Sequence, residues 1–188
     1  VAPYRVLAVT FTNKAAQEMK ERVKAVLFEV DRDSVRLGTP EVGTFHSICV
    51  RILRQELSVT PFTKSFVIYD DSDQLSLIKS VMQKLDIDKK AVNPKAIQGS
   101  INRAKCDALE PNEVEASPYS MYEKNFKKIY EQYQKDLITN NALDFGEILC
   151  MTYRIFRDFP DVRKKYQERF QFIHVDEYQD TNRAQYLL

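Results

Sequence analysis

The sequence predicts an α/β protein, because short apolar segments rich in β-branched residues alternate with longer segments of helical periodicity. The first such strand is Tyr4–Phe11, and the same character returns near the other end at Phe170–Val175. No segment between Asp71 and Asn141 has the composition of a strand. We therefore predict a parallel sheet domain, residues 1–70 and 142–188, interrupted by an all-helical insert at residues 71–141.

Composition restricts the class of protein. The 188 residues are 44% hydrophobic and 29% charged, which fits a soluble globular chain with a core. A net charge of +1 gives no global signal for nucleic acid, so such binding needs a local patch. Three widely spaced cysteines form no metal or disulfide pattern, which favours a reducing compartment, and we expect a cytoplasmic protein. No apolar run approaches the roughly 18 residues of a membrane span.

The first part of the chain alternates strands and helices. After the first strand, Thr12 or Asn13 can cap a helix whose apolar residues recur at helical spacing. A second short strand is predicted at Glu41–Phe45, followed by a helix through His46–Leu57. A third strand candidate lies at Ser65–Asp70. This order is typical of a parallel α/β layer.

Three helices are predicted next. Asp70–Leu85 is a capped amphipathic helix, and a shorter helix begins near Pro94. A long helix covers Tyr119–Ile138 and carries a tyrosine-rich face, which we interpret as core rather than as a base-stacking surface. That face comprises Tyr122, Phe126, Ile129 or Tyr130, Tyr133 and Leu137.

Helices and one strand complete the chain. A helix is predicted over Leu143–Phe156, and Pro160 opens another. The strand Phe170–Val175 follows and is apolar except at Gln171 and His174. We assign His174 to packing.

Two adjacent acids, Asp176 and Glu177, end the last strand. In open parallel sheets, ligands bind beyond the carboxyl ends of the strands. One carboxylate there can hold a hydrated Mg²⁺, while the other faces a water that attacks the terminal phosphate of a nucleotide. The alternative is a solvated turn with an acidic helix cap. The long polar string DEYQDTN decides for the nucleotide site.

Three motifs resemble those of superfamily-one DNA helicases of the UvrD/Rep/PcrA type. The string VDEYQDTNRAQY resembles motif II, LAVTFTNKAAQEM resembles motif Ia and GTFHSICVRIL resembles motif Ib, in the family's order and spacing. The segment Asn140–Leu149 resembles a further family segment, although Gly146 stands where the family pattern has an acid. The resemblance implies a RecA-like sheet of the P-loop NTPase type with an inserted helical subdomain.

The resemblance also implies a function. It implies ATP-dependent translocation on single-stranded DNA and 3′-to-5′ unwinding at a single-strand/duplex junction, in repair or replication. By motif match, Asp176 would ligate Mg²⁺ and Glu177 would position or deprotonate the attacking water. Gln179 and Asp180 would lie near the nucleotide and link its state to the DNA.

Two aromatic and polar strings at strand ends are candidates for DNA contact. A translocating motor holds DNA without reading its sequence, so rings stack on bases and polar or basic groups hold phosphates. Core packing of Phe11 and Phe45 and helix capping by the small polar residues are the alternatives, and we assign Phe45 to the core. The resemblance favours DNA contact for Phe11, Thr12, Asn13, Lys14, Thr44 and His46.

The phosphate-cradle motif GxxxxGK[ST] does not occur in the sequence. The resemblance places it upstream of motif Ia, and places a second motor domain with an arginine finger downstream. We therefore expect a fragment that lacks the first strand and the P-loop and is inactive alone. We also expect an unpaired flank on Phe172–Val175, covered either by a longer parent chain or by an interchain contact in a dimer.

Two other functions stay open. One is a non-catalytic DNA-binding module that kept the fold and lost the motor, which an intact phosphate loop upstream would exclude. The other is the motor core of a helicase–nuclease subunit, which a nuclease domain in the parent protein would identify.

Overall fold

The structure is a computed structural model that describes residues 1–30, 38–89, 92–115 and 120–188. Helices alternate with short parallel strands, which confirms the predicted α/β class. The chain forms two compact units. The first, which we call the sheet unit, comprises Val1–Gln55 and Thr152–Thr181. The second, the helical unit, comprises Glu56–Met151 and Asn182–Leu188.

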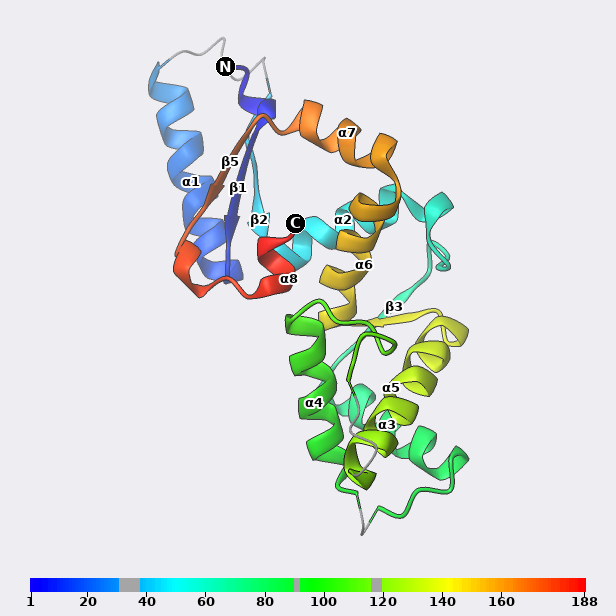
Figure 1. The fold of residues 1–188 in the computed structure, drawn as a ribbon. Coiled ribbons are helices and arrows are strands. Elements are labelled where there is room, and N and C mark those ends of the chain that lie inside the picture. Colours follow the sequence, from blue (N-terminus) through cyan, green and yellow to red (C-terminus); the bar gives the residue numbers. More distant parts are fainter. Residues whose placement is uncertain (31–37, 90–91, 116–119) are drawn as a thin grey trace. The chain divides into compact units, whose positions relative to one another are not determined.

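Three parallel strands form the sheet of the sheet unit. They are β1 (Val6–Thr10), β2 (Glu41–Thr44) and β5 (Phe172–Val175), in the order β2-β1-β5 (Figure 1). Thr10 is in register with Thr44, and Val9 is in register with Val175. The carboxyl ends of all three strands therefore lie at the same edge of the sheet.

Helices connect and cover these strands. Helix α1 (Asn13–Val30) follows β1 and packs against β1 and β2, whereas α7 (Pro160–Arg169) leads into β5. Helix α2 (Phe45–Gln55) starts without a connecting loop after β2. This abrupt start requires Gly43, because a Cβ there would come within 2.6 Å of Ser47 Oγ. Helix α6 (Phe145–Asp158) spans the border between the units.

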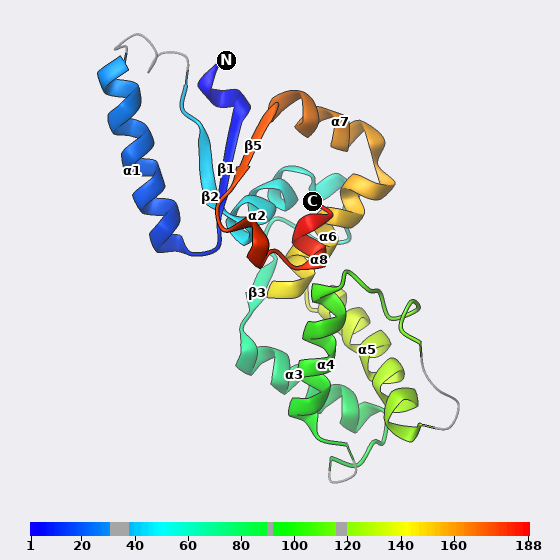
Figure 2. The ribbon, with the colours of Figure 1, turned by 60° about the vertical axis from the view of Figure 1, so that its left-hand side comes forward.

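Three of the predicted helices build the helical unit. They are α3 (Asp71–Lys84), α4 (Pro94–Cys106) and α5 (Met121–Thr139), as Figure 2 shows. Their shared core confirms the tyrosine-rich face of α5 as core, with Tyr130 and Tyr133 at most 1% exposed. Tyr122 is the exception at 39% exposed. Tyr119, the predicted first residue of this helix, lies outside the described residues.

A second, two-stranded sheet differs from the prediction. Strand β3 (Val67–Tyr69) pairs in parallel with β4 (Ala142–Asp144), not with β1 or β2. The prediction missed β4 and extended the following helix back to Leu143. Three residues are too few to show a strand period, and Asn141 O accepts the Val67 N–H across 74 residues of sequence (3.0 Å). The short helix α8 (Arg183–Tyr186) completes the unit.

Strand β5 pairs with β1 alone among the described strands. Phe172 is 44% exposed, Ile173 is 58% exposed and His174 is also exposed. The assignment of His174 to packing is therefore wrong, because an edge strand leaves its side chains accessible here. The expected unpaired flank of this strand is present.

Within the described ranges, no helix has the length and apolar character needed to cross a membrane.

Candidate functional site

The candidate residues gather where the three parallel strands end. Phe11 follows β1, Phe45 follows β2 and Asp176 follows β5. The backbone N–H of Asp176 donates to Val9 O at 2.9 Å, so the pairing with β1 continues into the first of the two acids. Strand order and register thus place the aromatic strings and the acidic string in three adjacent connections.

The acidic pair sits on a turn of unusual conformation. Asp176 and Glu177 are both exposed, and Glu177 has left-handed dihedral angles, φ 50° and ψ 46°. This conformation costs about 1–2 kcal/mol for a residue with a Cβ. Glu177 O accepts the N–H of Asp180 at 2.9 Å, and the Gln179 side-chain amide donates to the Glu177 carboxylate. Asp86, Ala108 and Asn141 also have positive φ, so the conformation of Glu177 supports a functional position only together with its place at the end of β5.

The predicted nucleotide-side residues therefore share one short segment. Gln179 and Asp180 belong to the 3₁₀ turn Tyr178–Asp180 that follows Glu177, and both are exposed. Gln179 contacts Glu177 directly through its side chain, whereas Asp180 does so through its backbone. The structure thus brings Asp176, Glu177, Gln179 and Asp180 together at the end of β5.

The side chains at the end of β5 indicate how a metal ion could bind there. The described part of the chain holds no cluster of three or more His, Cys, Asp or Glu side chains placed to bind a metal ion. Mg²⁺ does not need one, because it keeps several waters and is held by one or two carboxylates together with phosphate oxygens. An exposed carboxylate at Asp176 fits that mode of binding.

The aromatic residues of the two strings differ in exposure. The rings of Phe11 and Phe45 are in contact, with centroids 5.6 Å apart and planes tilted by 57°. Phe45 is 8% exposed, which confirms it as core. Phe11 is half-buried. Packing against Phe45 fixes the position of the Phe11 ring while part of its surface stays accessible.

The polar residues of the two strings lie at helix starts. Thr12 Oγ1 accepts the N–H of Ala15 at 3.1 Å, and Thr44 Oγ1 accepts the N–H of Ser47 at 3.2 Å. Both threonines thus cap helices, and Thr44 is only 7% exposed. Three further candidates lie in the first turns: Asn13 and Lys14, which are exposed, and His46, which is half-buried.

Sequence reasoning overlooked Thr10. Its side chain is fully buried, and Oγ1 donates to Thr12 O at 3.1 Å, tying the end of β1 to the start of α1. The available signal was a threonine that closes an otherwise apolar strand. The left-handed conformation of Glu177 has no comparable signal, because its residue type does not favour positive φ.

The helical unit holds a buried ionic cluster next to Gly146. Lys105 Nζ lies 2.7 Å from Asp144 and 3.0 Å from Glu147, with all three side chains at most 4% exposed. Tyr133 OH donates to the same Asp144 oxygen at 2.6 Å. Burial alone would lower the pKa of Lys105, but the two carboxylates outweigh burial and raise it.

Gly146 makes room for the buried lysine. A Cβ at Gly146 would lie 2.8 Å from both Cβ and Cδ of Lys105. The Lys105 stem thus occupies the space in which a side chain at position 146 would begin.

Comparison with known proteins matches the whole chain. The model of the UvrD/REP helicase N-terminal domain matches residues 1–188. The chain is 44% identical over 188 residues to the ATP-dependent DNA helicase PcrA of Bacillus subtilis, covering 100% of this chain and 25% of that protein. It is 41% identical over 189 residues to PcrA of Leuconostoc citreum, covering 24% of that protein. The chain thus spans about a quarter of the length of these relatives. It belongs to the UvrD/REP helicase N-terminal domain family.

Proposed function

We propose that this chain contributes the metal-and-water side of an ATP site, and part of a DNA path, to an ATP-dependent DNA helicase. One observation carries the proposal: the Asp176 N–H pairs with Val9 O, which sets the acidic string beside the aromatic string that starts at Phe11. The names of the PcrA relatives support the same activity.

On the nucleotide side, each residue has a distinct part. Asp176 would hold Mg²⁺, which when bound would supply positive charge to the phosphate oxygens. Glu177 orients the attacking water and accepts its proton. Gln179 steadies the Glu177 carboxylate through their hydrogen bond, and Asp180 fixes the turn through its N–H. Gln179 and Asp180 also lie near the nucleotide in this proposal.

On the DNA side, the two helix starts face single-stranded DNA. Phe11 stacks on a base, while Asn13, Lys14 and His46 contact phosphates. Thr12 and Thr44 act at the same place by fixing where α1 and α2 begin, so that N-terminal amides meet the backbone. We further propose 3′-to-5′ movement towards a single-strand/duplex junction, with residues 71–141 as an inserted subdomain.

The chain alone should lack turnover. Phosphoryl transfer in P-loop proteins needs a phosphate cradle, the metal and a charge-stabilising arginine together, and the sequence contains no GxxxxGK[ST] motif. Steady-state ATP hydrolysis by the purified 188-residue chain would contradict this expectation.

The test of the proposed function is Glu177→Gln in the full-length protein. The amide keeps the shape of the side chain but cannot accept a proton, so DNA-stimulated ATP turnover should fall by at least about a hundredfold. Equilibrium binding of nucleotide should change little. Glu168→Gln is the matched control, because Glu168 is an exposed acid on α7 that lies 3.9 Å from the similarly exposed Lys164. Unchanged turnover in Glu177→Gln would refute the role of Glu177.

A further inference from the structure

We propose that the open edge of β2 accepts an extended acidic segment of a partner protein as an added strand. The part of the edge that we propose as the binding site lies at the amino end of β2, away from the candidate functional site. The candidate functional site adjoins Thr44, the last residue of the strand, whereas the proposed binding site includes Glu41, the first residue. The inference does not depend on the proposed ATP or DNA contacts.

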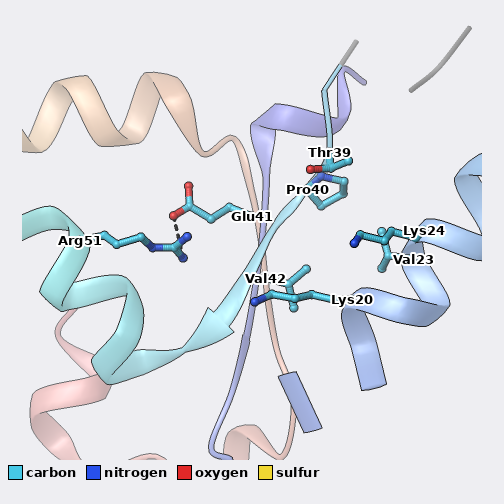
Figure 3. A pocket seen from close by; sticks show the side chains of 8 residues that line it. All are labelled: Lys20, Val23, Lys24, Thr39, Pro40, Glu41, Val42 and Arg51. Carbon is cyan, nitrogen blue, oxygen red and sulfur yellow. Dashed lines mark ion pairs between the residues drawn. The ribbon is translucent and has the colours of Figure 1, made fainter. Parts of the chain in front are cut away.

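A groove runs beside the amino end of β2 (Figure 3). Its cavity has a volume of about 370 Å³, and it lies between α1 on one side and α2 on the other. Lys20 and Lys24 come from α1, Glu41 and Val42 from β2, and Arg51 from α2. Every one of these residues belongs to the sheet unit.

The strand at the base of the groove has an open edge. Among the described strands, β2 pairs with β1 alone. An edge strand presents a row of backbone N–H and C=O groups that can pair with another extended chain. Recognition by strand addition uses such an edge for affinity and the flanking side chains for specificity.

The flanking side chains favour a negative partner. Lys20 and Lys24 are exposed and lie one helical turn apart, and within the described ranges no ion pair engages either of them. Glu41 is the one acid among the lining residues that the structure describes, and it is paired with two arginines. Glu41 lies 2.9 Å from Arg51 and 2.7 Å from Arg169. The positive charge of the two lysines is therefore available to acidic side chains of a partner.

The same lining favours a peptide over a nucleic acid. Among the lining residues that the structure describes, none is Phe, Tyr, Trp or His, so these side chains offer bases no stacking surface. Val23, Val42 and Pro40 instead offer apolar contact to the aliphatic side chains that alternate with acidic ones along a strand.

The binding experiment uses the full-length protein and fluorescein-labelled peptides in which Glu alternates with Val. Fluorescence anisotropy should show saturable binding that weakens with added salt. Peptides alternating Gln with Val, or Lys with Val, should bind at least about tenfold more weakly. The Glu–Val peptide N-methylated at alternate residues should lose about as much, because it cannot pair with the strand edge.

Charge reversal locates the site. Lys20→Glu with Lys24→Glu should weaken binding of the Glu–Val peptide by about tenfold or more. Arg22→Glu is the matched control, since Arg22 is exposed on the same helix but does not line the groove, and it should leave affinity unchanged. Circular dichroism and thermal melting establish that each variant is folded.

Three outcomes would overturn the proposal. Equal binding of the Glu–Val and Lys–Val peptides would show that charge does not select the partner. Equal affinity of the N-methylated peptide would exclude strand addition. The third outcome is that an oligothymidylate competes with the peptide. If the double lysine variant then loses binding of both the oligothymidylate and the peptide, the groove is a nucleic-acid site.

Discussion

At the scale of single residues, Gly146 and Lys105 occupy a space that accommodates only one side chain. Lys105 is buried between two acids and cannot swing into solvent without breaking both ion pairs. The contact that a Cβ at position 146 would make is with the stem of the lysine, near its own backbone, where flexibility is least. The identity of residue 146 therefore depends on residue 105.

Gly146→Ala should accordingly destabilise the protein. The added methyl group forces the Lys105 stem to move in a closely packed site, at a cost of about 1–3 kcal/mol in the free energy of unfolding. Urea titration followed by circular dichroism measures this change.

Gly99→Ala is the control for that experiment. Gly99 lies inside α4, and a Cβ there meets nothing within 4 Å. Alanine should therefore stabilise the helix by about 0.5–1 kcal/mol. The same loss of stability in both variants would disprove the account of Gly146.

At the scale of elements, the ionic cluster joins parts of the chain that are distant in sequence. Lys105 lies on α4, Tyr133 on α5, Asp144 on β4 and Glu147 on α6. Asp144 Oδ1 also accepts the N–H of Glu147 at 2.7 Å, so the same acid caps the start of α6. The buried cluster around Lys105 thus links four elements of the chain.

Lys105→Met should destabilise the helical unit strongly. The variant removes the ammonium group that lies 2.7 Å from Asp144 and 3.0 Å from Glu147 in a buried site, which costs about 3–5 kcal/mol at neutral pH. In the unaltered protein the Lys105 pKa is raised, so its contribution is lost only as the pH rises through that alkaline pKa.

Lys84→Met serves as the matched control. Lys84 Nζ also lies 2.7 Å from a carboxylate, that of Asp136, but the lysine side chain is 56% exposed. The Asp136 carboxylate is only 10% exposed, but the lysine end of this pair is solvated, so its loss should cost less than the loss of Lys105. Chemical unfolding of both variants across the pH range would reveal the difference. Equal losses would mean that burial does not set the strength of the Lys105 cluster.

At the scale of the whole molecule, the sheet has an accessible apolar strand at one side. Ile173 and Phe172 are half exposed on β5, and β5 has a strand neighbour on one flank only within the described residues. An open apolar edge favours pairing with another chain. We therefore propose that the isolated 188-residue chain associates into dimers through this edge.

Ile173→Lys should suppress that association. A charge on an edge strand opposes pairing with a second strand, so light scattering should show a shift towards the monomer mass at equal concentration. Val26→Lys is the control, since Val26 on α1 is exposed to a similar degree, 56% against 58%. A monomer in the unaltered chain at every concentration would rule out the dimer.

How much the sequence could predict depended on the length of each pattern. The runs at β1 and β5 are apolar over several residues, and helices such as α5 repeat their apolar face many times. Strand β4 has three residues and no period, so only its partner β3 reveals it. The Lys105 cluster depends on contacts across 39 residues of sequence, which local patterns do not encode.

The candidate site divides in the same way. Motif resemblance identified its residues, and the strand ends placed them, but the turn at Glu177 and the burial of Thr44 came from the structure alone. His174 was misassigned because the edge position of β5 is a property of the sheet, not of the segment.

The hydrogen bond between Asp176 N and Val9 O couples the position of the acidic turn to the end of β1. It joins the backbone of the acid directly to the end of the strand that precedes Phe11. A displacement of the acidic turn therefore pulls directly on the peptide two residues before the ring, with no intervening helix or loop to absorb it. The acidic turn and the aromatic string are therefore joined through a hydrogen bond that extends the β1–β5 ladder, two residues before Phe11.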